Sequence, residues 1–89
     1  MDRSFTKDEI KILGKLTAAG GTANVMEILE WPVSRFEEGF MLANEMQNSN
    51  LVKLLYSNFN KNLVVVELTL VGQNEYLQVM KTRREKPTS

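Results

Sequence analysis

Two short stretches hold the side chains best suited to contact a partner molecule. The first is the start of segment 34–47, which reads SRFEEGFMLANEMQ, and the second is segment 58–62, which reads NFNKN. Hydroxyl, amide and cationic groups donate hydrogen bonds to phosphate oxygens and to the base edges of nucleic acid. The candidate contact residues are therefore Ser34, Arg35, Asn58, Asn60, Lys61 and Asn62. The three asparagines of segment 58–62 are open to a second interpretation, since asparagine also favours turns for conformational reasons alone.

The composition argues against catalysis and against metal binding. The chain has neither histidine nor cysteine, so the commonest general base, the thiolate nucleophile and the commonest metal ligands are missing. It also has no glycine-rich phosphate loop, and its glutamates fall at helix-surface or capping positions. We therefore expect no enzymatic activity, no cofactor and no metal site.

Charge and length limit the class of protein further. Eleven basic residues balance eleven acidic ones, so no general field attracts nucleic acid or an anionic membrane. The charged N-terminus lacks the apolar core of a secretory signal, and no apolar run reaches the roughly 20 residues of a membrane span. We expect a cytoplasmic protein with one domain over 1–89, its core over about 6–80 and a flexible tail over 82–89.

The first half of the chain predicts two helices. Thr6 with Glu9 forms a capping box at the start of the first, and the glycine-rich segment 19–21 ends it. The second is short, is capped by Thr22 in this reading, and stops before Pro32 because the residue preceding a proline avoids helical geometry.

A third helix is predicted to begin near residues 32–34, with Ser34 and Glu37 forming a second capping box. Gly39 inside it either permits the close approach of another helix or is a tolerated defect. The side of this helix that faces the core is predicted to hold Phe36, Phe40, Ala43 and Met46 or Gln47.

The second half predicts a hairpin and a last helix. Segments 51–57 and 62–69 are rich in β-branched and large apolar residues, and the polar loop 58–62 separates them. Phe59 at the loop tip either contacts a partner or folds back on the sheet. Thr69 caps the last helix. A basic cluster follows, which is either a solvated terminus or a contact to a nucleic-acid backbone: Lys81, Arg83, Arg84 and Lys86.

Three helices, a two-stranded hairpin and a closing helix make an α+β domain. In this order they resemble the winged helix-turn-helix family, in the style of the MarR-like and PadR-like regulators. The resemblance spans about residues 6 to 80. Four stretches carry it: GGTANVMEILEWPVSRF, NEMQNSNLV, NFNKN and VVVELTLVGQNEYL. Within them, Asn50 replaces a glycine and Met46 replaces a leucine that are customary in the family.

The resemblance implies a transcription regulator that binds double-stranded DNA as a homodimer. Segment 34–47 takes the place of the recognition helix, and 58–62 takes the place of the wing tip. Each subunit would offer both to one half-site. The last helix would join the dimer interface through Tyr76, Leu77 and Met80.

The charge of the recognition segment opposes this reading. From Thr22 to Asn50 the chain has one basic residue, Arg35, against five acidic ones, a net charge of −4. Arg35 either contacts DNA or pairs with Glu38, three residues further on. The alternative function is a protein interaction module, in which an acidic face meets a basic partner protein: Glu37, Glu38, Met41 and Glu45.

Overall fold

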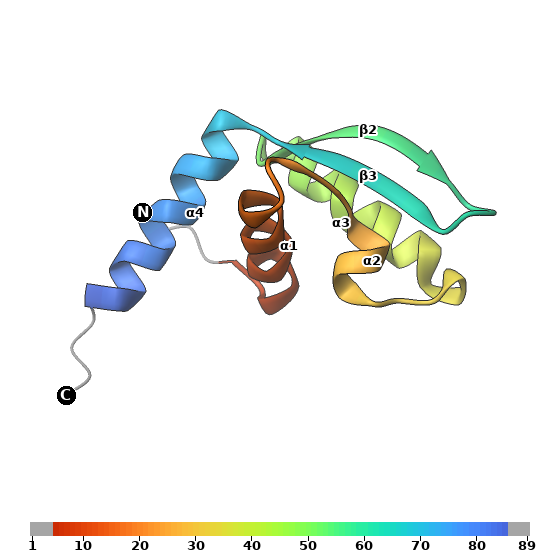
Figure 1. The fold of residues 1–89 in the computed structure, drawn as a ribbon, viewed down its shortest axis with the longest axis horizontal. Coiled ribbons are helices and arrows are strands. Elements are labelled where there is room, and N and C mark those ends of the chain that lie inside the picture. Colours follow the sequence, from red (N-terminus) through yellow and green to blue (C-terminus); the bar gives the residue numbers. More distant parts are fainter. Residues whose placement is uncertain (1–4, 86–89) are drawn as a thin grey trace.

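The computed structural model describes the backbone of residues 5–85 and the side chains of residues 5–81. This part of the chain forms an α+β fold with four α-helices and a three-stranded antiparallel sheet, which confirms the predicted class (Figure 1). The elements follow in the order α1 (Lys7–Ala18), β1 (Thr22–Asn24), α2 (Val25–Leu29), a 3-10 turn (Val33–Arg35), α3 (Phe36–Asn48), β2 (Val52–Asn58), β3 (Leu63–Leu68) and α4 (Leu70–Glu85).

The sheet has the order β1-β3-β2, and its first strand was not predicted from the sequence. Thr22 pairs with Glu67 in β3, so the prediction that Thr22 caps the second helix is wrong. Asn24 takes that role, because its side-chain oxygen accepts a hydrogen bond of 3.2 Å from the backbone N–H of Met26. The glycine-rich end of α1 therefore leads first into a strand and only then into α2.

The core lies between the sheet and the helices α1, α2 and α3, which lie on one side of it (Figure 1). Phe36 and Phe40 pack only partly buried against this core, whereas Ala43 and Met46 are fully enclosed, so the predicted inner side of the third helix is confirmed. The buried hydrophobic residues are Ile12, Leu13, Leu16, Val25, Met26, Ile28, Leu29, Ala43, Met46, Leu51, Val52, Val64 and Val66.

The start of α3 differs from the prediction. No side chain caps the helix, so the expected capping box of Ser34 and Glu37 is wrong. A 3-10 turn precedes the helix instead, in which the N–H of Arg35 donates to the carbonyl of Pro32 at 2.9 Å. This turn places Arg35, and not Ser34, at the N-terminal boundary of α3.

Gly39 lies where α3 packs closely against Met26 of α2. A side-chain carbon at this position would collide with the sulfur of Met26 and would lie 3.7 Å from the ring of Trp31. Of the two readings of this glycine, the close approach is confirmed.

The hairpin and α4 follow the predicted order. Leu54 pairs with Val66 and Tyr56 with Val65, so Leu55 is the extra residue of a bulge in β2. The hydroxyl of Thr69 accepts from the N–H of Gly72 at 2.9 Å, which confirms its capping role. α4 continues to Glu85, so the tail expected from residue 82 is helical that far, and Lys86 lies outside the described residues.

In Figure 1, α4 extends away from the sheet on the far side of α1. Among the described residues, no helix is long and apolar enough to cross a membrane.

Candidate functional site

Arg35, the one basic residue between Thr22 and Asn50, already has partners within the protein. Its Nε donates to Glu38 Oε1 at 2.7 Å, which confirms the predicted pair. The guanidinium carbon also lies 3.8 Å from the centre of the Trp31 ring, within the range of a cation–π contact. Both contacts lie at the surface, and 44% of the Arg35 side chain stays exposed.

The pair shifts the titration of Glu38. The hydrogen bond from Arg35 lowers the pKa of the Glu38 carboxyl, and the Arg35 charge lowers it further. Because the pKa of Glu38 is lower in the folded than in the unfolded state, the pair contributes to the stability of the fold at neutral pH. This contribution is lost as the pH falls through the folded-state pKa.

In Arg35→Gln, we expect the pKa of Glu38 to return to its usual range, because the partner that lowers it is gone. An NMR titration that follows the side-chain carboxyl carbon measures this pKa. An unchanged Glu38 pKa in that variant would show that the pair does not form in solution.

The outward side of α3 is acidic. Glu37, Glu38 and Glu45 are all exposed on it, and Met41 lies between them with 58% of its surface exposed. Two exposed amides, Asn44 and Asn48, continue the same side towards the C-terminus of the helix. We call these six residues the acidic face. Its three carboxylates face solvent, and only Glu38 has a basic partner in the described part of the chain.

The hairpin loop uses two of its asparagines to hold its own shape. Asn58 accepts from the N–H of Lys61 at 3.2 Å and donates to the Tyr56 hydroxyl at 2.9 Å. Asn62 adopts a left-handed backbone with φ of 54°, and its side-chain nitrogen donates to the carbonyl of Trp31 at 2.9 Å. Of the candidate contact residues in this loop, Asn60 and Lys61 are exposed, whereas Asn58 and Asn62 are half-buried.

Phe59 at the tip of the loop turns towards α3. Its ring meets Phe36 edge-on with centroids 5.4 Å apart, and Phe36 in turn lies 6.4 Å from Phe40. The ring stays 59% exposed, so it forms one wall of an open groove and not part of the core. We call this the aromatic groove. It has a volume of about 650 Å³ and is lined by Val33, Ser34, Phe36, Glu37, Phe40, Ser57 and Phe59.

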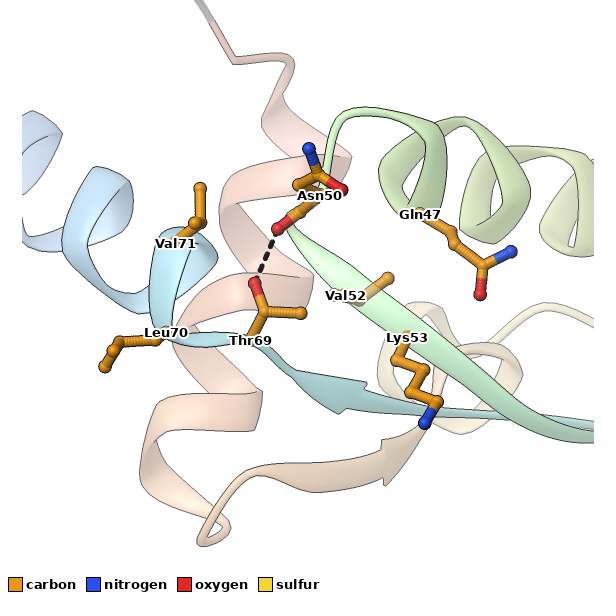
Figure 2. A pocket seen from close by; sticks show the side chains of 7 residues that line it. All are labelled: Gln47, Asn50, Val52, Lys53, Thr69, Leu70 and Val71. Carbon is orange, nitrogen blue, oxygen red and sulfur yellow. Dashed lines mark hydrogen bonds between the residues drawn. The ribbon is translucent and has the colours of Figure 1, made fainter.

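A second hollow of about 470 Å³ lies at the opposite end of α3 (Figure 2). The Thr69 hydroxyl there donates to the carbonyl of Asn50 at 2.5 Å, and Gln47 accepts from the backbone N–H of Leu54 at 2.8 Å. These side chains join α3, β2 and α4 to one another. We therefore assign this hollow a structural role; its lining residues are Gln47, Asn50, Val52, Lys53, Thr69, Leu70 and Val71.

The three residues proposed for a dimer interface lie in different surroundings. Tyr76 is half-buried, and its hydroxyl lies beside Gly14 of α1, where an added side-chain carbon would be 2.9 Å away. Leu77 is 50% exposed, whereas Met80 is half-buried. Leu77 is therefore the member of the three with most surface left for another molecule, and Leu70 at the start of the same helix is 73% exposed.

No family model, curated protein or solved structure matches the chain. The function proposed below therefore rests on the surfaces of the chain itself. Four residues of the acidic face, Glu37, Glu38, Met41 and Glu45, could be predicted from the sequence because they lie on one helix. The aromatic groove could not, because it joins residues from the α3 region to residues of the hairpin.

Proposed function

We propose that the protein is a winged-helix interaction module whose acidic face binds a basic segment of another protein. The order of three helices, hairpin and closing helix supports the winged-helix part of this proposal. Fold alone does not decide the ligand, because related folds carry unrelated binding sites. The choice of a protein partner rests on the chemistry of α3.

The observation that carries the proposal is the state of Arg35. DNA binding draws its affinity from cations that replace counterions at the phosphates. The single cation between Thr22 and Asn50 pairs with Glu38 through Nε and lies over the Trp31 ring, so a phosphate contact would compete with both interactions. Glu37 and Glu45 remain exposed on α3 and would repel a phosphate backbone. The same carboxylates attract lysine and arginine side chains, which suits a basic protein segment.

Selection of short random peptides displayed on phage, with the whole chain as bait, tests this function. We expect the selected peptides to be rich in lysine and arginine. Their synthetic forms should bind Glu45→Lys roughly five- to tenfold more weakly than the wild type, because attraction becomes repulsion. Fluorescence anisotropy measures both affinities, and added salt should weaken the wild-type complex.

Glu27→Lys is the matched control, since Glu27 is exposed on α2 outside the acidic face and the change in net charge is identical. An equal loss of affinity in both variants would assign the effect to net charge. Selected peptides without basic residues would refute the proposal.

A DNA-binding homodimer is the second candidate, and the exposed loop residues Asn60 and Lys61 favour it. In that case α3 would contact DNA together with the hairpin, and Tyr76, Leu77 and Met80 would join two subunits. Glu45→Lys distinguishes the two functions, because it should change the affinity for DNA and the affinity for basic peptides in opposite directions. Glu45→Lys removes a charge that repels phosphate, so it should strengthen binding to mixed duplex DNA at low salt while it weakens binding to basic peptides.

A further inference from the structure

The aromatic groove lies beside the acidic face and shares one residue with it, Glu37. Its walls are the rings of Phe36, Phe40 and Phe59, together with Val33, which is 43% exposed. Exposed aromatic and aliphatic surface around a hollow of several hundred Å³ is typical of sites that accept an apolar group. No lysine or arginine is among its lining residues in the described part of the chain.

We propose that the aromatic groove receives one large apolar side chain of the same basic segment that the acidic face binds. This inference rests on the proposed function and names the partner's chemistry: an aromatic or large aliphatic anchor with cations at defined distances. Charge complementarity identifies the occupant, because Glu37 lines the groove and Glu45 lies exposed eight positions further along α3. Interfaces often combine such a buried anchor with a charged rim.

Helix geometry sets the spacing of the cations. Glu45 follows Glu37 by eight positions in α3, which corresponds to about 12 Å along the helix axis. An extended chain covers about 12 Å in roughly four residues. The preferred segment therefore carries its first cation next to the anchor, opposite Glu37, and its second about four residues beyond the first, opposite Glu45.

Synthetic fluorescein-labelled peptides test the inference directly. The reference peptide has one phenylalanine, a lysine beside it, a second lysine four residues further on, and glycine and serine elsewhere. Replacing the phenylalanine with serine should weaken binding at least about tenfold in anisotropy titrations, because the anchor is no longer buried. Moving the second lysine four residues further away should weaken binding about threefold, because it passes beyond Glu45.

Two variants of the chain locate the anchor. Ser57→Trp fills the groove from an exposed strand position and should abolish the tenfold preference for phenylalanine over serine. Thr22→Trp, on the opposite edge of the sheet, is the matched control and should keep it. Val33→Ser removes apolar lining without filling the groove and should reduce the preference. Amide NMR spectra show whether each variant is folded, and in the wild type the largest peptide-induced shifts should fall at residues 33–40 and 57–59.

The outcomes separate this inference from the proposed function. If Glu45→Lys weakens peptide binding but phenylalanine and serine peptides bind equally, the acidic face is a binding site and the groove is not. If neither substitution matters, both proposals fail. A phenylalanine preference that survives in Ser57→Trp places the anchor elsewhere and overturns the inference.

Discussion

Gly72→Ala is expected to destabilise the protein by about 3 kcal/mol, near the upper end of the usual cost of overpacking. Gly72 is buried where α4 begins, directly against the end of the segment that leads into β2. A side-chain carbon there would collide with the carbonyl oxygen of Leu51 and lie 2.8 Å from its carbonyl carbon. These are backbone atoms, so α4 or the start of β2 must move. Chemical denaturation followed by circular dichroism measures the loss.

Gly14→Ala is the matched control for that substitution. A side-chain carbon at Gly14 would lie 2.9 Å from the hydroxyl of Tyr76, which is the far end of a flexible side chain and can move aside. Alanine also favours a helix interior over glycine by about 1 kcal/mol. Gly14→Ala should therefore be close to neutral. Equal destabilisation by both variants would mean that the backbone contact at Gly72 is not the cause.

Asn24→Ala is expected to cost about 3 kcal/mol, because one side chain holds three parts of the fold together. Its oxygen accepts from the N–H of Met26 at the start of α2 and from the N–H of Val64 in β3, at 2.8 Å. Its nitrogen donates to the carbonyl of Asn62 at 3.2 Å. Loss of a helix cap costs about 1 kcal/mol, and an unpaired buried N–H costs about 1–3 kcal/mol. Denaturant titration measures the sum.

Asn24→Asp distinguishes the contribution of the Asn24 oxygen, which accepts hydrogen bonds, from that of its nitrogen, which donates one. Aspartate keeps the acceptor for both N–H groups but cannot donate to Asn62, so we expect a loss of about 1 kcal/mol. Hydrogen exchange at the Val64 amide should accelerate in the alanine variant and stay slow in the aspartate variant. Slow exchange of Val64 in both variants would show that the bond from Asn24 does not protect that amide.

The parts of the fold that were predicted depend on signals close together in sequence. The capping box of Thr6 and Glu9 and the cap at Thr69 each join atoms within three residues. The hairpin was visible because two apolar runs flank a polar loop. The strand β1 was not visible, because three residues hold no pattern of their own and pair only with β3, more than 40 positions away.

The residues of the candidate site also fall into those that short-range sequence spacing indicated and those that only the fold brings together. The pair of Arg35 and Glu38 and the acidic face lie on one stretch of helix, so spacing alone indicated them. The aromatic groove requires Phe36 and Phe59 to meet, which depends on the angle between hairpin and helix. The roles of Asn58 and Asn62 were ambiguous in sequence, because asparagine serves both turns and ligand contacts. In the structure, the side chains of both form hydrogen bonds that hold the loop.

The bond between Asn62 and the carbonyl of Trp31 has a consequence for any partner of the groove. It fastens the base of the loop to the segment that leads into α3, so the two walls of the groove are held in place before a ligand arrives. A receptor with fixed walls loses little conformational freedom on binding, and the ordering cost falls mainly on the incoming segment. Short and already rigid segments should therefore be preferred over long flexible ones of the same composition.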